Sequence, residues 1–73
     1  MMGVETHLFA SSANIVSAAY DDDSEDLTIE FQSGDRYLYR NVPKTVFRRM
    51  QHAPSAGQYF YRQIRNAYQY EQV

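Results

Sequence analysis

Hydrophobic and polar residues alternate with a period of two through the middle of the chain, and this pattern predicts strands. The alternation is strict over residues 27–32, which is typical of a half-buried strand. Residues 15–20 form a short apolar segment, and residues 36–40 carry a tyrosine at every second position. Turn-forming residues separate these segments, an acidic run at 21–26 and Ser-Gly-Asp at 33–35. We therefore expect an antiparallel three-stranded meander with one buried face.

The period becomes helical after this meander. Val42, Val46, Phe47 and Met50 recur at helical spacing, and Pro43 suits the first turn of a helix. This pattern predicts a first helix, which ends before the next proline.

A second helix is expected from about Ala56, because Ser55 and Gln58 match a capping box. Residues 67–73 form either a tail held by its tyrosines or a short added strand. The expected order is three strands followed by two helices (βββαα), a small α+β domain in which the sheet packs against both helices. Residues 1–11 show no period and are expected to form a flexible N-terminal segment, with a single domain over residues 12–73.

The chain has 73 residues, enough for one domain, and its hydrophobic content of 44% is typical of a folded protein. Cysteine is absent, which excludes disulfides and thiolate chemistry. No apolar run is long enough to span a bilayer, and the first ten residues do not resemble a secretory signal. We expect a cytoplasmic protein that does not bind membranes.

The net charge of −2 hides an uneven distribution. Residues 1–35 contain eight acids and no lysine or arginine, whereas residues 36–73 contain all seven bases and one acid. Six of the bases are arginine, which suits phosphate and carboxylate groups. Two interpretations stay open: the two halves neutralise each other across the fold, or the bases form a surface for a partner.

Short motifs with a fixed order and spacing occur along most of the chain. They are Ser12-x-Asn14-Ile15, Ser17 with Tyr20-Asp21, Phe31-x-x-Gly34-x-x-Tyr37-x-Tyr39, Val42-Pro43, Ser55-x-Gly57-x-Tyr59-Phe60, Ile64-Arg65 and Tyr68-x-Tyr70. In these motifs the sequence resembles the KTSC domain from about residue 12 to the C-terminus. This family is named for the C-termini of lysyl-tRNA synthetases, where it is an appendage, and it also includes small stand-alone bacterial and phage proteins. The resemblance implies a member of this stand-alone kind, and RNA binding has been suggested for the family.

The sequence departs from the family pattern in the second expected helix. Tyr61 and Gln63 stand where members often carry Asn and His, and Asn66 stands where Gly is frequent. These differences weaken the idea of a polar site on this helix that is common to the family. Arg65 matches the family and is the first charged residue that we carry over.

Two groups of residues are candidates for a binding site. The first is a basic strip for phosphates, for which ion pairing within the fold is an equally weighted alternative; its members are Arg36, Arg40, Lys44, Arg62 and Arg65. The second is a group of ligand contacts, comprising Ser12, Asn14, Tyr37, Tyr39 and Tyr68. Tyr37 and Tyr39 suit a stacking platform for bases, but the apolar pattern favours core positions for both. Ser12 and Asn14 are better explained by hydrogen bonds to the backbone where a strand begins.

Other chemistry is not supported. The acidic run at 21–26 lacks the glycine and the distant glutamate of a calcium loop, and the histidines and acids show no zinc-ligand spacing. His7 and His52 are the conventional general bases, and neither belongs to a recognisable catalytic arrangement. We therefore expect no enzyme activity, no catalytic residue, no cofactor and no bound metal.

The sequence suggests two classes of function. The first is a non-enzymatic module that binds RNA or single-stranded nucleic acid through its arginine-rich second half. The second is a protein-interaction or self-assembly module, in which an open sheet edge pairs with another protein or with a second copy. Acidic and basic faces that meet between molecules would also support this second class.

Overall fold

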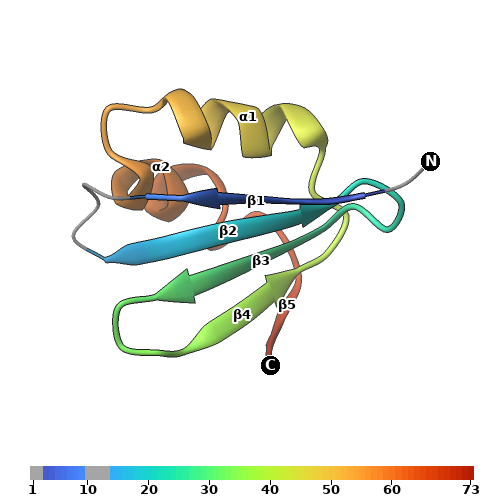
Figure 1. The fold of residues 1–73 in the computed structure, drawn as a ribbon, viewed down its shortest axis with the longest axis horizontal. Coiled ribbons are helices and arrows are strands. Elements are labelled where there is room, and N and C mark those ends of the chain that lie inside the picture. The colour runs from blue at the N-terminus through green and yellow to red at the C-terminus, as the bar shows by residue number, and fades with distance from the viewer. Residues whose placement is uncertain (1–2, 10–13) are drawn as a thin grey trace.

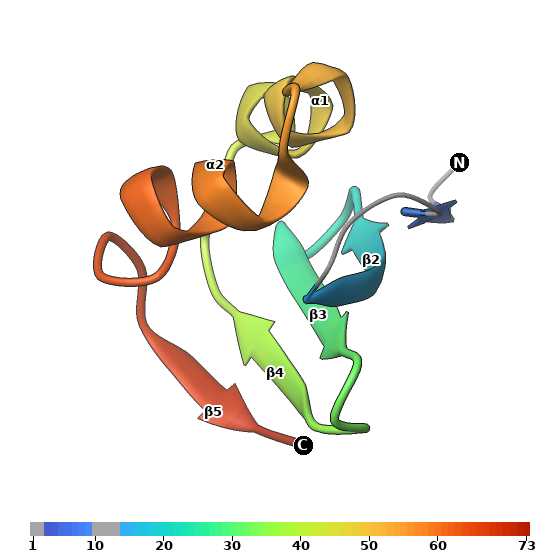
Figure 2. The same cartoon turned by 90° about the vertical axis from the view of Figure 1, so that its left-hand side faces the viewer.

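The computed structural model describes residues 3–9 and 14–73 and shows an antiparallel sheet with two helices on one of its faces (Figures 1 and 2). The elements are β1 Val4–Leu8, β2 Ile15–Asp21, β3 Asp26–Phe31, β4 Arg36–Tyr39, α1 Lys44–His52, α2 Ala56–Gln63 and β5 Tyr70–Gln72. The sheet has five strands in the order β1-β2-β3-β4-β5. The predicted α+β class is confirmed. None of the helices in the described part of the chain is long and apolar enough to cross a membrane.

The three predicted strands correspond to β2, β3 and β4, and the structure adds a strand at each edge of the sheet. β1 lies within residues 1–11, which we expected to have no regular structure, so that expectation is corrected for residues 4–8. The C-terminal residues were expected to form either a tail or a short added strand. The strand is present as β5, which pairs with β4.

A β-bulge near the start of β2 changes which of its side chains reach the core. Ile15 pairs with Phe31 and Ser17 pairs with Glu30, so Val16 is the extra residue on the bulged strand. Ile15 is therefore fully buried, whereas Val16 is half-buried. A strand with an uninterrupted period of two would instead have placed Val16 inward.

Both predicted helices are present and begin as expected. Pro43 directly precedes α1, which buries Phe47 and Met50 against the sheet. Ser55 caps α2, because its side-chain oxygen accepts a hydrogen bond of 3.3 Å from the backbone N–H of Gln58.

The core lies between the inner face of the sheet and the two helices. It consists of Ile15, Ala18, Tyr20, Leu27, Ile29, Tyr39, Val42, Phe47, Met50, Ala56, Phe60 and Ile64. No polar or charged residue among those described is buried with them. The other face of the sheet carries no helix (Figure 2).

Candidate functional site

Five aromatic rings on four elements form a closed circuit of contacts at the β5 side of the molecule. Phe60 of α2 contacts Phe31 of β3 and Tyr39 of β4, with both pairs of ring centroids 5.4 Å apart. Tyr37 of β4 lies 5.8 Å from Phe31 and 5.6 Å from Tyr70 of β5. Tyr70 closes the circuit with a distance of 5.3 Å to Tyr39. Most of these pairs meet edge to face or tilted, geometries that aromatic pairs prefer.

The strand register explains why these rings meet. Tyr37 and Tyr39 are two residues apart on β4 and therefore point to the same face of the sheet, the face that carries the helices. Tyr70 lies directly opposite Tyr39 in the β4–β5 pairing, so its ring extends the same face. The short β5 strand thus completes the aromatic surface.

These rings line a groove of about 210 Å³ that is open to solvent. We call it the aromatic groove; its members are Phe31, Tyr37, Tyr39, Phe60, Tyr61, Arg65 and Tyr70. Tyr39 and Phe60 are only 3% and 4% exposed and form its floor. Tyr61 and Tyr70 are 54% and 55% exposed and present their rings at its sides. Exposed tyrosines around buried rings provide flat surfaces on which a planar ligand can stack.

A guanidinium group stands at the helical side of the aromatic groove. The Cζ atom of Arg65 lies 5.1 Å from the centroid of the Tyr61 ring, a cation–π contact. The backbone positions this arginine, because the N–H groups of Ile64 and Arg65 both donate to the carbonyl of Phe60 as α2 ends. The groove therefore combines ring faces with one permanent positive charge.

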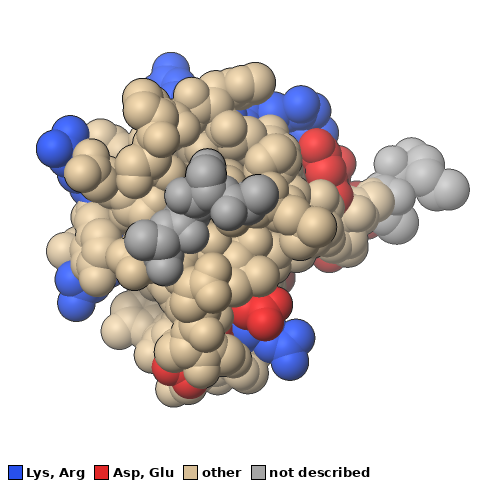
Figure 3. All heavy atoms as spheres, turned by 60° about the vertical axis from the view of Figure 1, so that its left-hand side comes forward, with Lys and Arg blue, Asp and Glu red and all other residues tan. Residues whose placement is uncertain are grey.

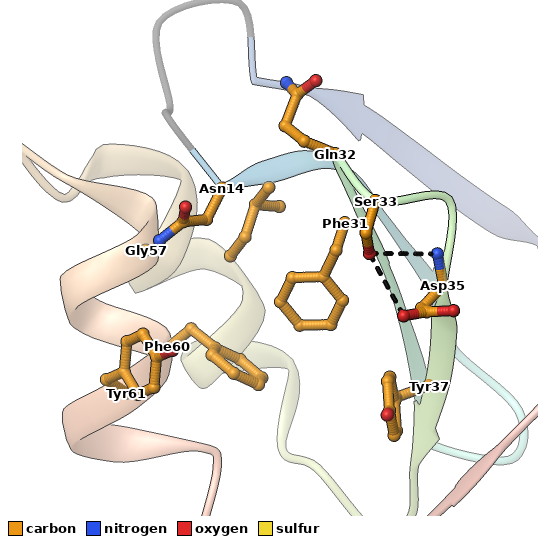
Figure 4. A pocket seen from close by; sticks show the side chains of 10 residues that line it. Asn14, Phe31, Gln32, Ser33, Asp35, Tyr37, Gly57, Phe60 and Tyr61 are labelled. Carbon is orange, nitrogen blue, oxygen red and sulfur yellow. Dashed lines mark hydrogen bonds between the residues drawn. The ribbon is translucent and has the colours of Figure 1, made fainter.

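A second depression of about 320 Å³ continues from the aromatic groove (Figure 4). It shares Phe31, Tyr37, Phe60 and Tyr61 with the groove and adds polar groups, so we call it the polar end; these groups belong to Asn14, Gln32, Ser33 and Asp35. Figure 4 shows Asn14 on the side of α2 and the Ser33 and Asp35 side chains on the side of the β3–β4 hairpin. The volume is at the lower limit of typical small-molecule sites, roughly 300–1,000 Å³.

Hydrogen bonds hold the acidic group of the polar end in place. The Ser33 hydroxyl donates to Oδ2 of Asp35 over 3.1 Å, and Nε2 of Gln72 approaches Oδ1 at 3.4 Å. Gly34 makes this hairpin possible, because its φ of +95° lies in the left-handed region. The polar end thus offers a fixed carboxylate beside aromatic walls.

Burial keeps the phenol of Tyr39 protonated over a wide pH range. Loss of hydration, with smaller effects from Tyr70 and Tyr37, raises its pKa to about 12, and Arg65 opposes the rise. At neutral pH the floor of the aromatic groove is therefore uncharged.

Of the five bases proposed for a phosphate strip, two are paired with acids. Arg40 lies 3.1 Å from Glu71, and Lys44 lies 3.1 Å from Asp22. All four side chains are well exposed, so water and salt screen these pairs.

The other three proposed bases lie in different places. Arg65 belongs to the aromatic groove, and Arg62 lines a separate depression together with Pro54 and Tyr59. Arg36 begins β4 and, by alternation along the strand, points to the face opposite Tyr37. On the face drawn in Figure 3, the Lys and Arg side chains lie in separate groups around the margin.

The structure brings together some of the proposed ligand contacts. Tyr39 lines the aromatic groove, Asn14 lines the polar end, and Tyr37 lines both. Tyr68 is half-buried against the core and is not among the residues that line either part. Ser12 lies outside the described residues.

Sequence reasoning did not identify the two most exposed rings of the groove, Tyr61 and Tyr70, as site residues. The spacing of Tyr61 and Arg65, four residues apart on a predicted helix, is the signal that would have found this pair. In residues 3–9 and 14–73, no three His, Asp or Glu side chains converge as they would around a metal ion.

Relatives of this chain include lysine–tRNA ligases. It is 44% identical over 54 residues to the lysine–tRNA ligases of Trichormus variabilis and of a Nostoc species, and 40% identical over 55 residues to that of Nostoc punctiforme. Each match covers about three quarters of this chain and 10% of the ligase. The chain therefore spans about a tenth of the length of these relatives.

A family model and a solved structure agree with these matches. The crystal structure of a KTSC domain protein from Yersinia pestis superposes with a TM-score of 0.89 and 27% sequence identity. That superposition covers 97% of this chain and 99% of the other. The model of the KTSC domain matches residues 11–68, which include most of the described elements. The chain thus belongs to the KTSC domain family.

Proposed function

We propose that this chain is a non-enzymatic module that binds single-stranded nucleic acid, with RNA as the first candidate, through the aromatic groove. The observation that carries this proposal is the pair of exposed rings, Tyr61 and Tyr70, at the sides of a groove floored by buried rings, with the Arg65 guanidinium beside Tyr61. Proteins that bind single strands combine such rings with positive charge, because bases stack on the rings and phosphates attract the cations.

Stacking is the larger part of the expected affinity. One base on an aromatic side chain contributes about 1–3 kcal/mol. Tyr61 and Tyr70 are each more than half exposed, so a base can reach their faces without moving the core. The net charge of −2 gives no general attraction to phosphate, which leaves the local groups of the groove to bind the strand.

The polar end supplies groups that suit the edge of a stacked base. Asn14 offers both a donor and an acceptor, and the Asp35 carboxylate offers acceptors. Asp35 lies on the hairpin side of this depression and Asn14 on the α2 side, and the rings of Phe31 and Tyr37 belong to the same lining. A base held against these rings would therefore have a polar group within the lining on either side of it. Unstacked bases of RNA are commonly recognised in this way.

The relatives favour RNA over other flat ligands. By their names, the ligases of Trichormus variabilis and the two Nostoc strains join lysine to tRNA. This chain matches a tenth of each ligase, so the ligation reaction is not part of the proposal. What the proposal takes from them is a partner class, RNA, for which the groove offers the appropriate chemistry.

A titration of a short fluorescently labelled single-stranded RNA with this protein tests the proposal. At about 50 mM salt, we expect Tyr61→Ala to weaken binding roughly 5- to 150-fold, the loss of one stacked base. Arg65→Ala should also weaken it. Arg49→Ala is the matched control, because it removes the same charge from an exposed site on α1 outside the groove.

Two outcomes would contradict the proposal. One is the absence of binding at low salt for RNA of every base composition. The other is binding that Tyr61→Ala and Arg65→Ala leave unchanged while Arg49→Ala weakens it, since the strand would then lie elsewhere.

A further inference from the structure

β1 is an open edge of the sheet, and its outward backbone groups belong to alternate residues. Asp22 donates its N–H to the carbonyl of Gly3, and Phe9 donates its N–H to the carbonyl of Val16. Odd-numbered residues of β1 therefore direct their backbone groups toward β2, as in any antiparallel ladder. The N–H and C=O groups that point away from β2 are those of Val4, Thr6 and Leu8. Within the described part of the chain, β2 is the only strand beside β1.

This edge lacks several of the features that usually prevent pairing with another strand, and it carries one charged side chain, Glu5, which lies 3.9 Å from Arg48 of α1. Its sequence, Val-Glu-Thr-His-Leu, contains no lysine and no proline, and its register with β2 runs without a bulge from Val4 to Leu8. The side chains of Val4 and Leu8 are 65% and 72% exposed. Figure 2 shows β1, in dark blue, at one margin of the sheet with no helix or strand beyond it.

We infer that β1 pairs with β1 of a second copy of this chain, antiparallel and around a two-fold axis at Thr6. This register places Val4 opposite the partner's Leu8 and Glu5 opposite the partner's His7. The five residues are thus complementary to themselves, with apolar residues opposite apolar ones and an acid opposite an imidazole. A two-fold interface requires such self-complementarity.

The geometry of the edge supports this register over its neighbours. When two β1 edges pair antiparallel, each residue whose N–H and C=O point away from β2 must face another such residue of the second copy. Near the middle of the strand, the two-fold axis can therefore pass through Glu5, Thr6 or His7. An axis at Glu5 places two Glu5 carboxylates opposite each other, and an axis at His7 places the two His7 rings opposite each other. Only the axis at Thr6 pairs every outward N–H and C=O of the strand.

The dimer leaves the proposed nucleic-acid site accessible. β1 is the first strand of the sheet and β5 is the last, and the aromatic groove lies on the β5 side. Pairing at β1 joins the two sheets into one continuous sheet and keeps both grooves at its outer margins. The inference is therefore independent of the proposed function.

Sedimentation velocity of the full chain over a range of concentrations tests this inference. We expect a reversible monomer–dimer equilibrium, and we expect Thr6→Pro to weaken it at least tenfold. Proline removes the N–H of Thr6, which points away from β2, so the monomer keeps its β1–β2 hydrogen bonds. Gln72→Pro is the matched control, because it places proline on β5 at the other edge. If Thr6→Pro fails to fold, Leu8→Lys replaces it, since the Leu8 side chain is 72% exposed in the monomer.

Disulfide trapping tests the register. The natural chain has no cysteine, so Thr6→Cys provides a single thiol. On the two-fold axis the two Cα atoms would lie about 5.5 Å apart, within the range of roughly 4.4–6.8 Å that a disulfide spans. Val4→Cys is the control, because its Cα would lie four residues, roughly 13 Å, from its own copy. We expect Thr6→Cys to form a covalent dimer much faster than Val4→Cys.

Four results would overturn the inference. They are a wild-type chain that stays monomeric at every concentration, a dimer unaffected by Thr6→Pro or Leu8→Lys, a dimer lost in Gln72→Pro instead, and equal trapping rates for the two cysteine variants. A foreign protein that binds this edge would leave the isolated chain monomeric and so would give the first of these results.

Discussion

Tyr20 connects the sheet to the loop before α1 through its hydroxyl, which donates a hydrogen bond of 2.6 Å to the carbonyl of Val42. Its side chain is 1% exposed and its ring stacks on Phe47. Burial, and to a smaller extent the nearby Glu25, Asp22 and Asp21 carboxylates, raises the pKa of the phenol. The hydroxyl therefore keeps its proton and remains a donor at neutral pH.

Tyr20→Phe is expected to lower the free energy of unfolding by about 1–3 kcal/mol. The substitution preserves the ring and leaves the buried carbonyl of Val42 without its donor. Urea denaturation measures the effect, and Tyr61→Phe, at a ring that is 54% exposed, is the control and should stay within about 0.5 kcal/mol of the wild type. Equal stability of the two variants would contradict this view of the Tyr20 hydrogen bond.

The raised pKa of Tyr39 predicts that the folded chain loses stability at alkaline pH. Its pKa is raised to about 12 in the folded chain from an ordinary value of 10.0. Between these values the unfolded chain releases the phenol proton and the folded chain keeps it, so unfolding becomes more favourable as the pH rises. The contribution is fully present below pH 10 and is lost as the pH passes about 12. In Tyr39→Phe, denaturation midpoints should fall less over this range than in the wild type; an unchanged decline would show that other groups cause it.

At the scale of single residues, the site could be predicted only in part. The period-two pattern correctly indicated that Tyr37 and Tyr39 face the core, and Tyr39 is indeed buried. The same pattern could not show that the Tyr37 ring remains half-exposed beside Tyr70, because that depends on a strand more than thirty residues away. Tyr61 was missed because it lies outside the apolar stripe of its helix, and because its cation–π partner Arg65, four residues on, was assigned to the basic strip.

At the scale of elements, the predicted strands and helices are those that bury one face. In β3, apolar and polar residues alternate because every second side chain points into the core. In α1 and α2, apolar residues recur at helical spacing because one face of each helix is buried. β5 is exposed along its whole length, and β1 half-buries the polar Glu5 and His7 while it exposes Val4 and Leu8. Neither edge strand therefore has an apolar face that the sequence pattern could reveal. The bulge at Val16 also leaves no local signal, since it depends on the pairing with β3.

The N-terminus of α2 provides a test at this scale. The hydroxyl of Ser55 accepts the N–H of Gln58, so Ser55→Ala should lower the free energy of unfolding by about 1 kcal/mol. Thermal or urea denaturation followed by circular dichroism measures this loss. Ser24→Ala, in the exposed turn between β2 and β3, is the control and should have little effect. A loss at Ser24 as large as that at Ser55 would mean that the cap is not what stabilises α2.

At the scale of the whole molecule, the acidic first half and the basic second half meet through pairs on the surface. Arg40–Glu71 lies within the second half, whereas Lys44–Asp22 and Arg48–Glu5 join the two halves. All are exposed, and such pairs contribute about 0–1 kcal/mol each. Neutralisation within the fold, the first of the two interpretations of the charge distribution, therefore applies to Arg40, Lys44 and Arg48. Arg65 instead lies against Tyr61 in the aromatic groove, as the second interpretation, a surface for a partner, requires.

This division of charge predicts a weak dependence of RNA binding on salt. For single strands, the slope of log K against log salt is about −0.7 for each phosphate neutralised. If Arg65 contacts phosphate and at most two further bases reach the strand, the slope should lie between about −0.7 and −2. A strip that used all seven bases would give about −5. Titrations at several salt concentrations measure the slope, with unfolding over the same range as a control for the fold. A slope near −5 would show that the bases as a group, and not the groove, form the binding surface. A shallow slope together with an affinity that Tyr61→Ala leaves unchanged would contradict stacking as the source of binding.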